Sequence, residues 1–325
     1  MNPDDENNQT INHFKLLPVE VGELIADYLT PKETKMLALS SKATFFVVQD
    51  PLVKLKVKHL LTCVAYGQQD EAEKLLTTCQ MNTNYELTQA SLQLNSAPFT
   101  DYSGRTFDCT AYEYAYWAKD THMCRMLEKH MDADTKAAML AKCEKMEREG
   151  LKYMQDGQEF NSRHFDFTKL KDALKAYVGG YDGWFAANNW PAMDAAWLKV
   201  GLEQRDVPAH VVHEYCNPNR PFYPMPSFDR PPSSRILTFY NWGTGSLESW
   251  FPLGAGENSG LGFDFTLYRG SERGRPLVCW KGWLQGAALD LAAVSRLDKV
   301  RSADLTQLRE ALMPVELEQN LGMSS

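Results

Sequence analysis

The chain has 325 residues, of which 44% are hydrophobic and 23% are charged, and its net charge is −8. These values are typical of a globular protein, and the acidic balance argues against a nucleic-acid backbone as the main partner. No run of about 18 apolar residues predicts a membrane span. The acidic start also lacks the basic and apolar segments of a secretory signal.

The seven cysteines are spread along the chain, and no two of them have CxxC spacing. An odd number of scattered cysteines does not fit a disulfide framework, and a reducing compartment is the simpler interpretation. We therefore expect a cytoplasmic protein.

Residues 1–13 are polar and predict a disordered tail, whereas residues 14–50 carry apolar side chains at helical spacing. The apolar positions between Val21 and Leu29 fall on one helix face. The Thr30-Pro31 step predicts the end of this helix, because a residue that precedes proline disfavours the α conformation. Two short helical patterns follow, and Pro51 marks a boundary. Three helices this short bury little core alone and need a partner or a neighbouring domain.

Residues 51–132 predict helical hairpins, with a break at Gly67 and a turn at Asp101-Tyr-Ser-Gly104. The helical segments here are Lys54–Val64, Asp70–Cys79, Ala111–Ala118 and Thr121–Met131.

Residues 133–325 predict an α-rich C-terminal domain, so the fold class is mainly α. Residues 236–283 are rich in aromatics and glycine and predict a small antiparallel β element. Residues 217–234 are rich in proline and aromatics, which predicts an ordered loop. The expected helices are a long one over 133–155 and shorter ones over Leu170–Tyr177, Met193–Leu202, Leu284–Val294 and Ala303–Met313, the last with Ser302 as its N-cap.

The first helical unit resembles the F-box family. The resemblance rests on Leu17-Pro18-Val19-Glu20-Val21, on Ile25, on Tyr28-Leu29 and on the segment Leu37-Ala-Leu-Ser-Ser41-Lys42. Gly22 and Thr34 depart from the family, which usually has bulky aliphatic residues there.

An F-box is a small helical unit that completes its core against Skp1, and through Skp1 it joins cullin-1 in a ubiquitin ligase. The resemblance therefore implies a substrate adaptor with no active site and no cofactor of its own, whose other domains bind the target protein. The alternative interpretation is that these residues are the first helices of a larger α domain. The residues that would contact Skp1 are Leu17, Pro18, Val21, Ile25, Leu29 and Leu37.

Two later segments resemble degenerate ankyrin helix pairs. One runs from Thr110 through Ala115-Tyr116-Trp117-Ala118-Lys119 to Leu127, and the other from Cys63-Val64-Ala-Tyr-Gly67 to Leu75-Leu76. The equivalent positions are Gly67 and Lys119, and they lie farther apart than the ankyrin repeat of about 33 residues. Unrelated helical hairpins are the alternative.

An F-box followed by ankyrin-like helices is similar to secreted effector proteins of intracellular bacteria such as Legionella. The blocks Gly104-Arg-Thr-Phe107 and His164-Phe-Asp-Phe167 are similar to a region of that group. This resemblance implies action on the host ubiquitin system, in the host cytosol after secretion.

Other chemistry has weaker signals. His210, His213 and Cys216 lie at i, i+3 and i+6 of a predicted helix, but structural zinc takes four ligands and no fourth is evident nearby. We therefore expect no metal site, and packed side chains are the simpler interpretation. A second functional hypothesis is an enzyme, a transferase or hydrolase, in residues 150–325. Its polar groups would include these three residues and Arg269.

Overall fold

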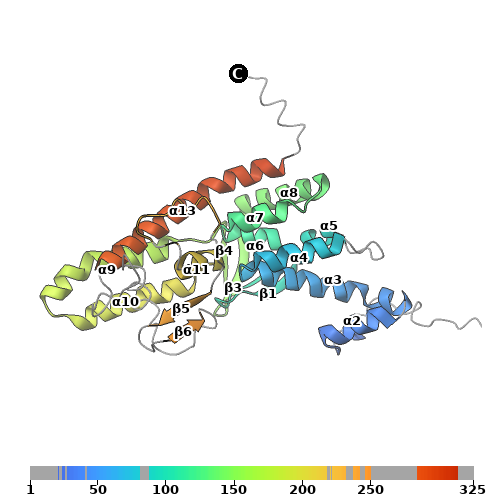
Figure 1. Cartoon of the computed structure of the whole chain (residues 1–325), viewed down its shortest axis with the longest axis horizontal. Helices are drawn as coiled ribbons and strands as arrows, with labels where there is room; N and C mark the ends of the chain where they lie inside the picture. The colour runs from blue at the N-terminus through green and yellow to red at the C-terminus, as the bar shows by residue number, and fades with distance from the viewer. Residues whose placement is uncertain are drawn as a thin grey trace, which may run out of the picture.

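The computed structural model describes the backbone of residues 21, 24–25, 28–40, 42–80, 88–217, 220, 222–231, 237–241, 246–249 and 284–313. The fold is mainly α with a small antiparallel sheet, which confirms the predicted fold class (Figure 1). The helices are α2 (Pro31–Ser40), α3 (Lys42–Ala65), α4 (Gln69–Gln80), α5 (Gln89–Leu94), α6 (Ala111–Trp117), α7 (Thr121–Glu128), α8 (Ala133–Glu149), α9 (Thr168–Ala186), α10 (Trp190–Arg205), α11 (Ala209–Cys216) and α13 (Leu284–Leu312).

Thr30 and Glu33 cap each other at the start of α2, in the N-terminal helical unit. The Glu33 carboxylate accepts hydrogen bonds from the Thr30 backbone N–H (2.8 Å) and hydroxyl (2.7 Å), and the Thr30 hydroxyl accepts from the Glu33 N–H. Pro31 takes the first helical position, where its missing N–H costs nothing. The unit has its own small apolar cluster, separate from the main core, in which Ile25, Leu37 and Leu52 pack against Ala38.

Helix α3 runs through Pro51, where the sequence predicts a break. This element therefore connects the N-terminal unit directly to the main core, which begins at Val57. Figure 1 places α2 at one end of the molecule and the α9–α10 hairpin at the other.

The two hairpins α3–α4 and α6–α7 end their first helix in the same way. The N–H of Gln68 bonds to the Cys63 carbonyl at 2.7 Å, and that of Asp120 bonds to the Ala115 carbonyl at 2.9 Å. The residue before each donor, Gly67 or Lys119, has a positive φ. This is the Schellman motif, and it gives Gly67 and Lys119 the same place at the end of their helices.

A four-stranded antiparallel sheet that the sequence does not predict lies between the hairpins and the C-terminal helices (Figure 1). Its strands, in their order across the sheet, are β1 (Ala97–Thr100), β2 (Thr106–Cys109), β3 (Leu151–Gln155) and β4 (Gln158–Ser162). The Asp101–Gly104 turn joins β1 to β2 as expected, with Gly104 at φ +79°. Because β2 pairs with β3, the two predicted segments 51–132 and 133–325 contribute strands to one sheet.

An aromatic core fastens the sheet to α6. The Phe107 ring centroid lies 4.9 Å from that of Trp117, 5.1 Å from that of Tyr153 and 5.2 Å from that of Tyr114. Such ring pairs add about 0.5–1.5 kcal/mol each beyond the area that they bury.

Three predicted helix boundaries are wrong. The expected helix over 133–155 ends at Glu149, because Gly150 adopts φ +80° and the chain then turns into β3. Helix α9 continues through Gly179, Gly180 and Gly183, and α13 is one helix instead of two. Ser302 lies inside α13 and bonds to the Asp298 carboxylate.

The proline-rich loop is ordered where it is described, since Phe222 and Phe228 are buried in the main core. The strands β5 (Thr238–Asn241) and β6 (Ser246–Ser249) pair as an antiparallel hairpin and supply a C-terminal β element. Apart from position 237, the other residues of the predicted β region, 236–283, lie outside the described residues. Among the helices that are described, none is long and apolar enough to cross a bilayer.

Candidate functional site

Helix α11 lies across the turn ends of both hairpins, and all eight of its residues are buried. The His210 Nε2 donates a hydrogen bond to the Ala118 carbonyl at 2.8 Å, at the α6–α7 turn. The His213 ring faces the α3–α4 turn so closely that a Cβ on Gly67 would lie 2.4 Å from its Cε1. The two histidines of the sequence motif therefore hold α11 against one hairpin each.

Helix α13 contacts the same α6–α7 turn through ion pairs. The Asp298 carboxylate accepts from Lys119 Nζ and from Lys171 Nζ, each at 2.7 Å. Burial alone would raise the pKa of Asp298, but these two hydrogen bonds outweigh it and hold the pKa below its usual value. Further along α13, the Asp304 carboxylate accepts from the Thr121 hydroxyl at 3.0 Å and pairs with Arg125 at 3.2 Å.

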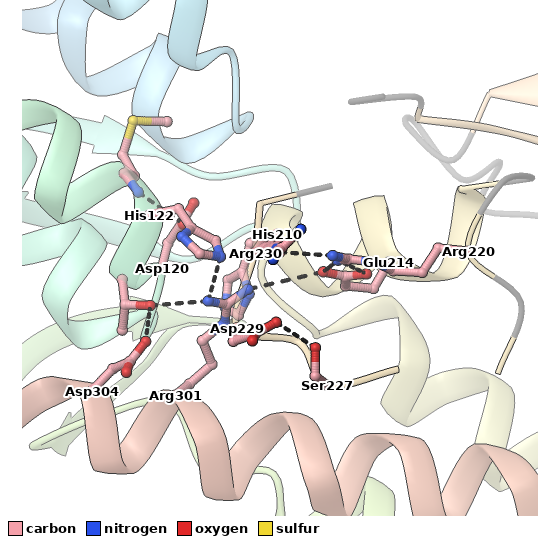
Figure 2. Close-up of polar contacts among 12 residues, drawn as sticks. Asp120, His122, His210, Glu214, Arg220, Ser227, Asp229, Arg230, Arg301 and Asp304 are labelled. Carbon is pink, nitrogen blue, oxygen red and sulfur yellow. Dashed lines mark hydrogen bonds and ion pairs between the residues drawn. The ribbon is translucent and has the colours of Figure 1, made fainter. Parts of the chain in front are cut away.

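A buried charge network joins α7, α11 and α13 (Figure 2). Arg301 donates from Nη1 to the Thr121 hydroxyl at 3.0 Å and to the His122 Nε2 at 2.7 Å. Its Nη2 lies 3.9 Å from Glu214, whose two carboxylate oxygens accept from Arg220 Nη1 at 2.7 and 2.9 Å. The Arg301 and Glu214 side chains are each only 1% exposed, so two of the charges are almost wholly removed from water.

This geometry requires a neutral His122, because its Nε2 accepts the hydrogen bond from Arg301. Burial, followed by the charge of Arg301, lowers the pKa of His122 to about 3, against an opposing effect of Asp120. Burial likewise lowers the pKa of His210 to about 4, with Asp120 opposing this effect and Arg301 adding to it.

The neutral histidines predict a loss of stability in mild acid. Their pKa values lie below that of an unfolded histidine, about 6.5. In mild acid the unfolded chain therefore binds protons that the folded chain does not bind. Between pH 6.5 and 5, the free energy of unfolding should fall by up to about 2 kcal/mol for each of His122 and His210. Urea titrations at pH 7 and pH 5 measure this difference, which His122→Gln should roughly halve. Equal or greater stability at pH 5 would contradict the assignment.

The weak metal candidates do not form a metal site. His210 and His213 have separate neighbours on different hairpins, and Cys216 is a buried thiol. Across the part of the chain that the structure describes, no three His, Cys, Asp or Glu side chains gather as metal ligands. Arg269, of the enzyme hypothesis, lies outside the described residues.

The residues expected to contact Skp1 fall into two groups. Leu17 and Pro18 lie outside the described residues. The other four, Val21, Ile25, Leu29 and Leu37, are half-buried in the N-terminal unit.

Different apolar residues are exposed on the same unit. They alternate with the half-buried positions along the chain, and none of them is among the residues expected to contact Skp1. Their exposed fractions are 58% for Leu24, 88% for Tyr28, 62% for Met36 and 65% for Leu39. We call these four the N-terminal apolar face.

These features define a mainly α protein in which C-terminal helices cover the turns of two helical hairpins, with an apolar N-terminal unit outside the main core. Over 328 aligned positions, the chain is 32% identical to a protein of Coxiella burnetii (strain RSA 493 / Nine Mile phase I) named "Uncharacterized protein CBUA0006", covering 94% of this chain and 89% of the relative. The chain belongs to the CBUA0006 family. Residues 169–312 match the family model described as the CBUA0006 C-terminal domain. No solved structure matches the chain.

The matched domain boundaries coincide with structural ones. The domain begins within the first turn of α9 and ends at Leu312, the last residue of α13. It therefore contains both helices, α11 and α13, that contact the hairpin turns.

Proposed function

We propose that this protein is an F-box adaptor. Its N-terminal unit binds Skp1 and, through cullin-1, brings a target protein to a cullin-RING ubiquitin ligase, as a bacterial effector would do in a host cell. The observation that carries this proposal is the N-terminal apolar face. A unit with a separate, small cluster and four large exposed apolar side chains has the surface of a docking module.

The position of the unit supports the same role. It lies at the end of the molecule opposite the α9–α10 hairpin, where a partner can approach without meeting the C-terminal helices (Figure 1). Within the unit, the half-buried Ile25 and Leu37 hold α2 in place while Met36 and Leu39 point to solvent. The half-buried residues are thus suited to support the face, and the exposed ones to contact Skp1.

The hairpin turns are unsuited to hold the target. In many repeat proteins the ends of repeats form a binding surface, but here α11 and α13 cover both turns through His210, His213 and Asp298. The target would therefore dock on another surface of the chain.

A pull-down with purified Skp1 tests the proposal. Wild-type protein should retain Skp1, and both Leu17→Ala/Pro18→Ala and Met36→Asp/Leu39→Asp should lose it. Leu198→Asp places the same charge on an exposed leucine at the far end of the molecule, and it should leave binding intact. Wild-type protein that melts cooperatively and yet retains no Skp1 would overturn the adaptor role.

A further inference from the structure

The outer face of α10 carries an apolar seam with coiled-coil spacing. The seam consists of Pro191, Ala195, Leu198 and Leu202, which follow one another at intervals of four, three and four residues. All four are exposed, and the two leucines keep 42% and 49% of their surface. Alternating intervals of three and four are those of the a and d positions of a heptad, so the seam is shaped to receive another helix. We call it the α10 seam.

The opposite face of α10 is already committed to the main fold. Its buried residues pack toward α9 and the core, and at 3.6 residues per turn they lie on the other side of the helix from the α10 seam. They are Met193, Trp197, Val200, Gly201 and Gln204. Since α10 already has its internal partner there, the α10 seam is a second, separate face.

The charges beside the α10 seam indicate which helix it fits. Asp194 and Lys199 are exposed and flank the seam on opposite sides, at the positions called g and e in a heptad. In a parallel pair of helices, a g residue meets the e residue five positions later on the partner. Asp194 and Lys199 stand at this interval and carry opposite charges.

We infer that the α10 seam binds a second copy of this chain, with the two α10 helices parallel about a two-fold axis. Each copy then supplies one acidic and one basic partner, giving two identical Asp194–Lys199 ion pairs across the interface. A surface that complements itself in this way is what a two-fold homodimer requires. Because the seam is short, we expect a weak dimer that forms only at high protein concentration.

The dimer leaves the N-terminal apolar face accessible, since α2 and the α9–α10 hairpin lie at opposite ends of the molecule (Figure 1). The inference therefore stands or falls independently of Skp1 binding. The two surfaces also have reciprocal controls, because Leu198→Asp should abolish only the dimer and Met36→Asp/Leu39→Asp only the binding of Skp1.

Sedimentation velocity of the full chain over a range of concentrations tests the inference. Wild type and Met36→Asp/Leu39→Asp should approach twice the monomer mass, whereas Leu198→Asp stays monomeric with an unchanged melting curve. Asp194→Lys should weaken the dimer about tenfold or less, and the swap Asp194→Lys/Lys199→Asp should restore it.

Three results would overturn the inference. If the wild type is monomeric at every concentration, the α10 seam does not bind a second copy of this chain. A dimer that survives Leu198→Asp would place the interface elsewhere. If Asp194→Lys/Lys199→Asp does not restore the dimer affinity that Asp194→Lys loses, the parallel register is excluded.

Discussion

Glu214→Gln is expected to lower the free energy of unfolding by about 3–5 kcal/mol, the usual cost of removing one partner from a buried ion pair. The substitution keeps the shape of the side chain but removes the charge that lies between Arg220 and Arg301. Arg301 would then be buried beside a neutral amide, with its remaining contacts directed to Thr121 and His122. Urea unfolding monitored by circular dichroism measures the loss.

Glu144→Gln is the matched control, because Glu144 is exposed on α8. An exposed charge of this kind contributes little, so this variant should stay within about 0.5 kcal/mol of wild type. If the two glutamine variants unfold at the same urea concentration, the network of Figure 2 does not hold α11 and α13 to the hairpins.

Gly67→Ala should destabilise the protein more than Gly104→Ala does. Both glycines have a positive φ, so both substitutions pay about 1–2 kcal/mol for a left-handed alanine. A Cβ at Gly104 meets nothing within 4 Å, whereas one at Gly67 would lie 2.4 Å from the buried His213 ring. Overpacking of this kind typically adds about 1–3 kcal/mol, measured as the difference between the two variants in urea unfolding.

A third variant assigns this extra cost to the contact between α11 and the α3–α4 turn. In a His213→Ala background, most of the difference between Gly67→Ala and Gly104→Ala should disappear, because the ring is gone and only the Ala209 Cβ, 3.3 Å away, stays close to the new methyl group. A difference that stays undiminished in this background would show that the His213 ring is not what limits the space at Gly67.

Local signals in the sequence were sufficient for much of the fold. Thr30-Pro31 separates the first helical segment from α2, Gly67 marks the break between α3 and α4, and Asp101–Gly104 is a turn. Each is set by the backbone preference of a few adjacent residues, which does not depend on the rest of the chain.

The errors in the fold arise where tertiary contacts outweigh those preferences. Glycine costs a helix about 1 kcal/mol, and α9 continues through three glycines because Tyr181 and Trp184, which lie among and beyond them, pack against the main core. Strand β3 was missed because Leu151 and Met154 continue the helical spacing of α8, although Gly150 was a usable signal for the helix end.

The site was harder to foresee than the fold. The motif His210…Cys216 drew attention to α11, but its role as a buried clamp depends on hairpins far away in the sequence. Arg301 carries no motif at all, and only the folded chain brings it to Glu214 and His122. Glu214 did offer a signal, since a carboxylate in a buried helix needs a buried partner.

The most direct test of the adaptor role is size-exclusion chromatography of the purified full chain with a preformed Skp1–cullin-1 complex. We expect all three proteins to elute together. Met36→Asp/Leu39→Asp should elute apart from the other two, whereas Leu198→Asp should still join them. Elution of well-folded wild-type protein separately from Skp1–cullin-1 would contradict the adaptor role. The N-terminal apolar face would then have to serve a different partner.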